Sequence, residues 1–169
     1  AKKAIQILKT GNREKSRSVL KLLEKIWRAD GWGNGGWLLF IKELENFDAI
    51  GTADNRASFL MALRYPFIAL GNKYFTECSD FVLKLLAHDS GRVRQLGVSL
   101  GGDFIHSFEI AKFVVEKKWR PNPKDAARIR GDRKLFVSFM ERLEAFRNDH
   151  CGARLAKFDY IEELPASIC

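Results

Sequence analysis

Two apolar stripes separated by a tight polar turn, within residues 79–105, constrain the fold more than any other feature of the chain. Each stripe repeats at the spacing of one helix face. The first contains Phe81, Val82, Leu85 and Leu86, and the second contains Val93, Leu96, Gly97 and Leu100. Asp89-Ser90-Gly91 between them predicts a turn in which Ser90 caps the second helix. Because neither helix can bury its apolar face alone, we expect the pair to pack on further helices.

This hairpin resembles the core of a HEAT repeat, a helix pair with leucines between its helices, an aspartate in the turn and an arginine near the start of the second helix. The residues that match are Leu85, Leu86, Asp89, Val93, Arg94, Leu100 and Gly101. The resemblance implies that Asp89 lies beside the first amides of the second helix and that Arg94 hydrogen-bonds a neighbouring turn. An ordinary helical hairpin in an unrelated α-domain is the alternative.

A fainter second copy of the pattern lies in residues 54–75. Leu70-Gly71 stands 30 residues before Leu100-Gly101 (100 − 70 = 30), and Leu63-Arg64 stands at the same distance before its counterpart. This period is within the range of helical-pair repeats. Pro66 stands where the later copy has a leucine. Because proline removes a helical hydrogen bond, it either kinks one long helix or marks the start of a new one.

The whole chain shows the pattern of a helical protein. No segment alternates apolar and polar residues between hairpin turns, so we expect no sheet and a single helical-repeat domain over residues 1–169. The resemblance implies an all-α, right-handed α-α superhelix of stacked helical hairpins of the HEAT/armadillo kind, with a compact helical bundle as the alternative. Glycines predict helix ends at Gly131-Asp132 and at Gly101-Gly102-Asp103, although a helix can also run through the latter segment.

The cysteines and the apolar runs indicate the environment. Cys78, Cys151 and Cys169 are an odd number without CxxC spacing, so we expect a reduced cytoplasmic protein in which Cys78 is a small core residue. No run approaches the roughly 18 apolar residues of a membrane span, so we expect no membrane contact. The first and last helices are polar enough to cap a free-standing array, which favours a monomer.

The net charge of +8 is concentrated in two basic segments. Residues 1–30 contain nine Lys or Arg and three Asp or Glu, and residues 117–134 contain eight and two, so each carries a net +6. This asymmetry indicates a polyanionic partner, a nucleic acid or an acidic protein, although solvated helix faces explain it equally well. We expect sequence-independent phosphate contacts in the second segment, at Lys117, Lys118, Arg120, Lys124, Arg128, Arg130, Arg133 and Lys134.

A glycine-rich segment, residues 30–37, presents two tryptophans. Its letters match GxGxxG, but a helix rather than a strand precedes it, so we reject a dinucleotide site. Trp32 is a candidate partner contact that can stack on a base or fill a pocket, and the equal alternative is that it folds back on the helix ends. For Trp37 the folded-back position is favoured.

The sequence offers no motif for catalysis or for cofactor binding. His88, His106 and His150 have no second ligand at metal spacing, and P-loop, nucleophile-elbow and HExxH motifs are absent. We therefore expect no catalytic residue, metal or cofactor, and interpret the chain as a non-catalytic helical-repeat module that binds a protein or nucleic-acid partner through a basic surface. The alternative is a DNA-alkylation-repair glycosylase, because some of these enzymes resemble HEAT-like solenoids with tryptophans, an acidic residue and a basic face.

Overall fold

A computed structural model describes the backbone of residues 1–29, 32–116 and 123–150, and the side chains of residues 1–29, 32–108 and 130–149. These residues form eight α-helices and one 3-10 helix, with no strand among them, so the predicted all-α class is confirmed for this part of the chain. None of the described helices combines the length and apolar character needed to cross a bilayer. In chain order the elements are α1 (Lys2–Thr10), α2 (Arg13–Arg28), α3 (Gly33–Lys42), η1 (Leu44–Ala49), α4 (Ala53–Ala62), α5 (Arg64–Leu70), α6 (Phe75–Leu86), α7 (Gly91–Glu116) and α8 (Pro123–His150).

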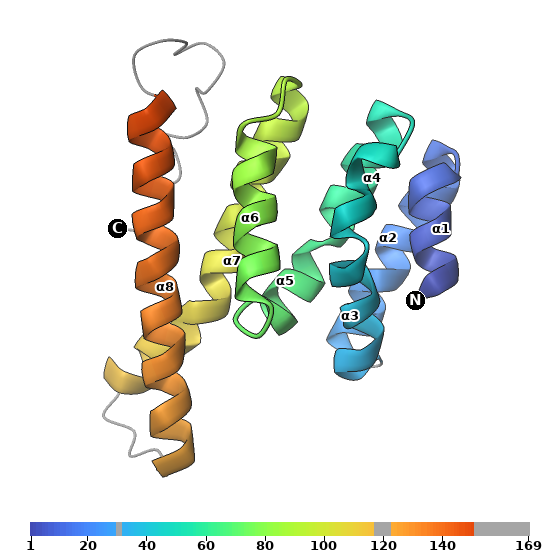
Figure 1. Cartoon of the computed structure of the whole chain (residues 1–169). Coiled ribbons are helices and arrows are strands. Elements are labelled where there is room, and N and C mark those ends of the chain that lie inside the picture. The colour runs from blue at the N-terminus through green and yellow to red at the C-terminus, as the bar shows by residue number, and fades with distance from the viewer. Residues whose placement is uncertain (30–31, 117–122, 151–169) are drawn as a thin grey trace.

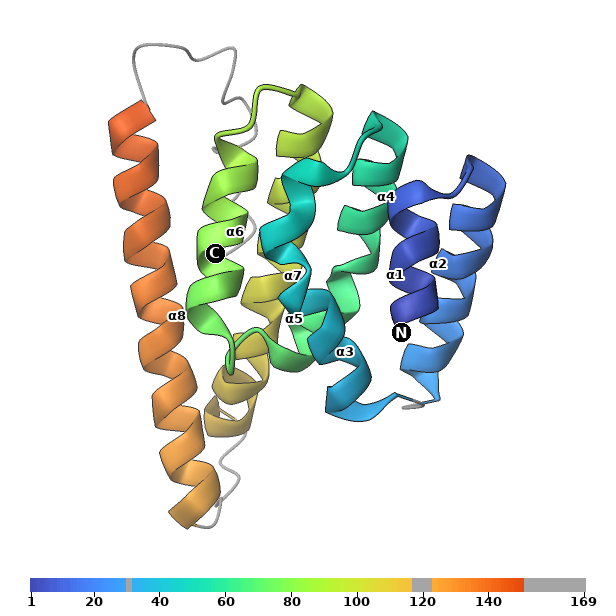
Figure 2. The same cartoon turned by 45° about the vertical axis from the view of Figure 1, so that its right-hand side comes forward.

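The helices follow one another across the molecule in chain order (Figure 1). The pair α1 and α2 lies at one end, α3, α4 and α5 come next, then α6 and α7, and α8 lies at the other end. In one layer α4 packs against both α2 and α7, and α5 packs against α7. Figure 2 shows α1, α3 and α6 in front of that layer. Consecutive helix groups thereby cover one another's apolar faces.

Phe104 in the middle of α7 is the centre of the aromatic core. Its fully buried ring lies 5.9 Å from Phe67 of α5, 5.9 Å from Phe75 of α6 and 4.7 Å from Phe139 of α8, measured between ring centroids. Tilted and edge-to-face ring pairs at such separations add to the free energy of burying the rings. One side chain therefore joins four helices.

The helix that begins at Ala53 breaks at Leu63, three residues before Pro66. Proline has no amide hydrogen, so the carbonyl group of Ala62 lacks its usual donor four residues later, and the proline ring crowds that turn. Consequently α4 ends at Ala62, and Pro66 lies in the first turn of α5. Of the two outcomes that the sequence left open, the structure has the new helix.

Helices α6 and α7 form the hairpin that the two apolar stripes predict. The buried apolar and glycine residues that carry the resemblance are Leu85, Leu86, Val93, Leu100 and Gly101. Arg94 is also buried, and its guanidinium donates hydrogen bonds to the carbonyl oxygens of His88 and Asp89, both at 3.0 Å. Arg94 thereby satisfies carbonyl groups just beyond the end of α6, within its own hairpin.

Two long helices run through glycines that predicted breaks. Helix α7 continues through Gly101-Gly102, and α8 continues through Gly131. The predicted helix end at Gly131-Asp132 is therefore wrong. An interior glycine costs a helix only about 1 kcal/mol. The packing of α7 on α5, α6 and α8 outweighs that cost.

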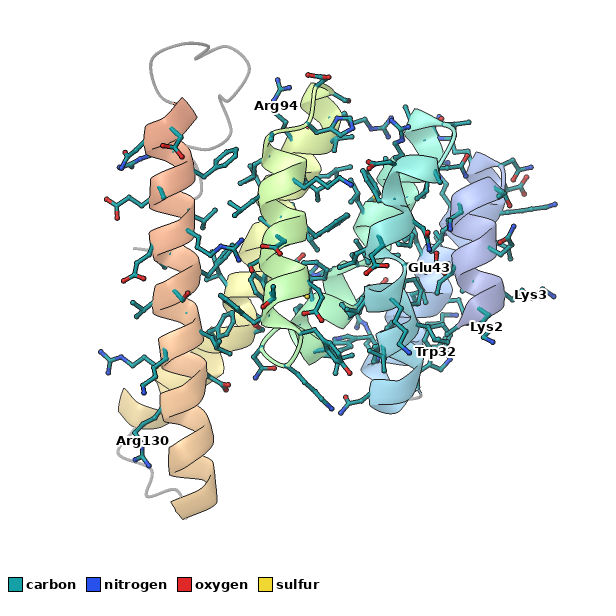
Figure 3. All side chains as sticks on the ribbon, in the orientation of Figure 1. Lys2, Lys3, Trp32, Glu43, Arg94 and Arg130 are labelled. Atoms are coloured by element: carbon teal, nitrogen blue, oxygen red, sulfur yellow. The ribbon has the colours of Figure 1, made fainter. Side chains whose placement is uncertain are left out.

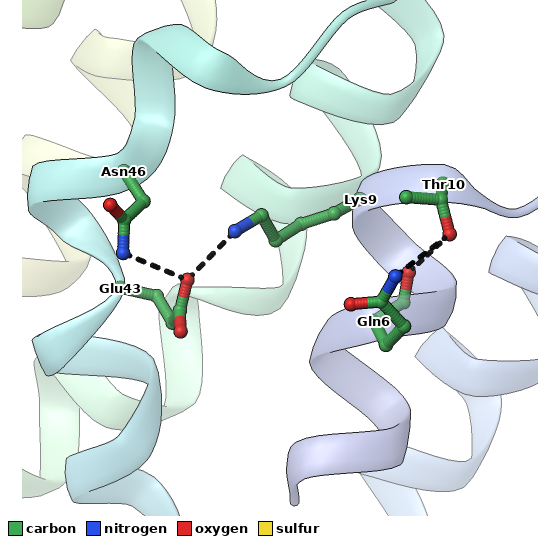
Figure 4. Close-up of polar contacts among 5 residues, drawn as sticks. All are labelled: Gln6, Lys9, Thr10, Glu43 and Asn46. Atoms are coloured by element: carbon green, nitrogen blue, oxygen red, sulfur yellow. Dashed lines mark hydrogen bonds and ion pairs between the residues drawn. The ribbon is translucent and has the colours of Figure 1, made fainter.

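Polar contacts fix α1 to its neighbours. The buried Asn55 side chain of α4 donates hydrogen bonds to the carbonyl oxygens of Leu8 and Gly11, at 3.0 and 2.8 Å, where the end of α1 lacks helical donors. Lys9 of α1 reaches Glu43 at 2.8 Å, and Glu43 also accepts a hydrogen bond from the 3-10 helix (Figure 4). These contacts hold the terminal helix pair in place.

Candidate functional site

The predicted contact residues of the second basic segment are only partly described. Arg130, Arg133 and Lys134 have described side chains, and all three are exposed on α8. The residues that lie outside the described side chains are Lys117, Lys118, Arg120, Lys124 and Arg128. Five of the eight predicted cations therefore lie on α8, and three of these five have described side chains.

The first basic segment forms an exposed surface on α1 and α2. Two of its nine cations are paired, Lys9 with Glu43 at 2.8 Å and Arg28 with Glu24 at 2.7 Å. The other seven, here called the α1–α2 basic face, are exposed and form no ion pair within the described residues; they are Lys2, Lys3, Arg13, Lys15, Arg17, Lys21 and Lys25. An anionic partner can reach these cations without first breaking an internal ion pair.

The two basic regions lie at opposite ends of the molecule. Figure 3 shows Lys2 and Lys3 at the α1 end and Arg130 at the α8 end, with the other helices between them. Within the described side chains, the two regions do not merge into one patch. A small anion or a short peptide therefore contacts one region at a time, and only an extended polyanion can contact both.

Trp32 packs back onto the protein. Its ring centroid lies 5.1 Å from that of Trp37 and 6.1 Å from that of Phe40. Trp37 is buried and packs in turn against Trp27 and Tyr65, at 5.9 and 5.8 Å. Trp32 itself is half-buried, so only part of its ring remains open to a partner.

A groove with a volume of about 480 Å³ lies between α2, the α4–α5 segment and α7. This volume is within the usual range for ligand pockets, about 300–1,000 Å³. The apolar side chains that line it are Leu20, Leu60, Met61, Leu96 and Leu100. Met61 leaves 54% of its surface exposed. The groove thus offers open apolar surface to a ligand.

Charged side chains from three helices line the same groove. They are Lys21 and Glu24 of α2, Arg64 of α5 and Asp103 of α7. Arg64 and Asp103 form an ion pair at 3.2 Å between α5 and α7, and Glu24 is held by Arg28. The charges of these four lining residues sum to zero, and Lys21 is the one among them that forms no ion pair within the described residues.

Burial changes the acid–base behaviour of two groove residues. It raises the pKa of the Asp103 carboxyl above the ordinary value, against the opposing effects of Arg64 and His106. The pKa of Tyr65 is raised chiefly by burial and then by the negative charge of Glu24. Tyr65 therefore remains a neutral hydrogen-bonding group at neutral pH, and Asp103 is harder to ionise than an exposed carboxyl.

The described side chains do not gather into a metal-binding group. No group of three or more His, Cys, Asp or Glu among them could hold a metal ion. His88 Nδ1 accepts a hydrogen bond from the Ser90 amide at 3.0 Å, and burial followed by the charge of Arg56 lowers the pKa of the imidazole. Cys78 is buried as predicted, and burial raises the pKa of its thiol, which suppresses the reactive thiolate.

The sequence did not reveal the groove, because its lining comes from separate helices. Arg64 and Tyr65 follow the break before Pro66, and Asp103 lies in a segment that predicted a helix end. A weak signal exists in hindsight, since Asp103 is a charged residue within an otherwise apolar helix pattern.

The chain was compared with protein families, curated proteins and solved structures. No protein-family model matches the chain, and no curated protein or solved structure matches it either. Because none of them matches, any functional conclusion depends on the two basic regions and the groove.

Proposed function

We propose that this chain is a non-catalytic helical interaction module that binds a polyanionic partner, and that the partner is a nucleic acid. The α1–α2 basic face carries this proposal, because its seven exposed cations have no internal ion pairs in the described structure. Arg130, Arg133 and Lys134 add a second exposed cluster on α8. Dispersed cations suit phosphate oxygens, which position a nucleic acid without reading its sequence.

The proposed architecture is a right-handed superhelix of stacked hairpins, similar to HEAT and armadillo repeats. The order of α1–α2, α3–α5 and α6–α7 across the molecule supports it, as does the burial of Leu86, Val93 and Leu100 in the central hairpin. In such an array the terminal hairpin has a polar outer face. The cations of α1 and α2 belong to such a terminal pair.

A salt titration tests the nucleic-acid proposal. Affinity for a labelled DNA duplex of arbitrary sequence, measured by fluorescence anisotropy, should fall steeply between about 50 and 200 mM salt. The triple variant Lys3→Gln, Lys15→Gln, Lys25→Gln should flatten the logarithmic slope by up to about 2.7, since each lost phosphate contact contributes about 0.9. None of these three lysines lines the groove.

A second triple variant tests the other end of the molecule. Neutralising Lys124, Arg128 and Arg130 should flatten the slope by a similar amount if the second basic segment also contacts phosphates. A slope that neither variant changes would remove both basic regions from consideration and refute the proposal.

A lesion-recognising DNA glycosylase is the second candidate, favoured by one observation. Asp103 is only 19% exposed at its side chain and lines the groove beside Arg64 and Tyr65, so an acidic group lies in a concave site. Incubation with alkylated DNA followed by chromatography of released bases decides the question, with Asp103→Asn as the control. Release no greater than in buffer ends this candidate.

A further inference from the structure

The groove between α2, the α4–α5 segment and α7 adjoins the α1–α2 basic face, which supplies Lys21 to its lining, and it provides a concave apolar surface that this face lacks. We infer that it is the docking site for an acidic, amphipathic segment of a protein partner. Its apolar lining would hold a large aliphatic or aromatic side chain of that segment, and Lys21 in the lining, with Arg17 beside it on α2, would pair with the neighbouring carboxylates. This inference does not depend on nucleic-acid binding.

The apolar lining suits a peptide side chain better than a nucleobase. The four leucines of the groove are aliphatic and provide no flat ring on which a base could stack. The aromatic ring that lines the groove, Tyr65, already packs against Trp27 and Trp37, at 5.6 and 5.8 Å. Met61, with 54% of its surface exposed, is a flexible side chain that adapts to the shape of an apolar anchor.

The charges around the groove select an acidic occupant over a basic one. The carboxylates of Glu24 and Asp103 are each held by an arginine, at 2.7 and 3.2 Å. Lys21 at the groove, and Arg17 one turn earlier on α2, are exposed and form no ion pair within the described residues. Carboxylates of an occupant can pair with these two cations, whereas a basic segment would be repelled by them.

The grooved surface is also large enough for an anchored interaction. A few side chains buried in a central pocket usually carry most of the affinity of a protein contact. An amphipathic helix laid along neighbouring helices presents such anchors one turn apart. The groove volume of about 480 Å³ can therefore receive the anchor of a segment whose remaining residues lie on the surfaces of α2 and α7.

The test uses the full chain and a labelled amphipathic peptide with leucine and phenylalanine on one face and glutamate on the other. Two control peptides replace the glutamates by lysines or the apolar residues by serines. We expect the acidic amphipathic peptide to bind at least about tenfold more tightly than either control, as measured by anisotropy. Equal binding of all three peptides, or no binding of the acidic one, overturns the inference.

Substitutions on exposed positions locate the peptide. Met61→Asp and Lys21→Glu should each weaken its binding by about tenfold. The matched controls on α2 are Leu22→Asp, an apolar residue that is 51% exposed, and Lys25→Glu, an exposed lysine one turn from Lys21; neither lines the groove. The controls should change affinity by less than about twofold. Equal losses in both pairs would show that the peptide binds elsewhere.

Two further measurements exclude other occupants. A single-stranded oligonucleotide whose binding is weakened by Met61→Asp, while peptide binding is not, would assign the groove to nucleic acid. Residues 158–164 of the chain, Phe-Asp-Tyr-Ile-Glu-Glu-Leu, have the same acidic and apolar composition. If neutralising their three carboxylates raises the affinity for the peptide, the groove belongs to this segment and the inference of a separate partner is wrong.

The Lys3, Lys15, Lys25 triple variant separates peptide binding from DNA binding. If the variant loses DNA binding but still binds the peptide, the two functions use different residues.

Discussion

Gly97 marks the closest approach of α6 and α7, and its substitution tests the packing of the central hairpin. A Cβ atom at this position would lie 2.8 Å from Leu85 Cβ and 3.4 Å from the Leu85 carbonyl carbon. Leu85 is fully buried, and its Cβ and carbonyl carbon are fixed by the backbone, so neither atom can move away cheaply. At Gly102 in the same helix, a Cβ atom would meet nothing within 4 Å.

The two glycines therefore form a matched pair. Alanine at either position should gain up to about 1 kcal/mol from helix propensity. At Gly97 alone, overpacking costs about 1–3 kcal/mol. We expect Gly102→Ala to stabilise the protein by about 0.5–1 kcal/mol and Gly97→Ala to be less stable than Gly102→Ala by about 1–3 kcal/mol.

Urea titration and thermal unfolding followed by circular dichroism measure this difference. For a chain of this size, each 1 kcal/mol shifts the melting temperature by about 2–4 °C, so the two variants should be clearly separated. In a Leu85→Ala background the difference in stability should persist, because alanine keeps the Cβ and carbonyl carbon that the new methyl group at position 97 would meet. Equal stability of the two alanine variants in the native background would show that α6 and α7 do not approach as closely as described.

Three further predictions follow from single side chains. Asn55→Ala removes one buried and one part-buried hydrogen bond to the end of α1 and should lower the free energy of unfolding in urea by about 2–4 kcal/mol. Asn72→Ala, with one part-buried hydrogen bond, should lower it by about 1 kcal/mol, and equal losses would contradict this expectation. Burial raises the folded pKa of Asp103 above its unfolded value, so the native state holds this proton more tightly and stability falls as pH rises above about 4. Asp103→Asn should make the free energy of unfolding depend less on pH in this range, despite the loss of the ion pair with the exposed Arg64. An unchanged pH dependence would contradict the role given to Asp103. With the other two cysteines replaced by serine, Cys78 should react with a thiol reagent only as fast as the protein unfolds, and rapid reaction would refute its burial.

The sequence predicts those parts of the fold whose causes are local. The α6–α7 hairpin follows from apolar residues at helical spacing and from a turn that ends at Ser90, directly before α7 begins at Gly91. The effect of Gly131 could not be predicted in the same way. Whether a glycine ends a helix depends on packing by neighbouring helices, such as the contact of Phe139 with Phe104, which no local pattern contains.

For the candidate site too, the sequence predicts what depends on local composition and not what depends on how the helices pack. Charge counts predict two basic segments, but they do not show that the segments lie at opposite ends of the molecule. They also do not show which cations are neutralised, because Lys9 finds its partner Glu43 in a distant part of the chain. The groove was unpredictable because Lys21, Met61 and Asp103 come together only when three helices pack.

Lysine footprinting of the protein–DNA complex tests the central claim most directly. Acetylation of each lysine in the full chain, measured by mass spectrometry with and without duplex DNA, reports which cations the partner covers. The account predicts that Lys3, Lys15 and Lys25 are protected, while Lys84 of α6, which pairs with Asp48 at 2.6 Å, reacts equally in both samples. A complex that forms while the lysines of α1 and α2 keep their full reactivity would contradict the account.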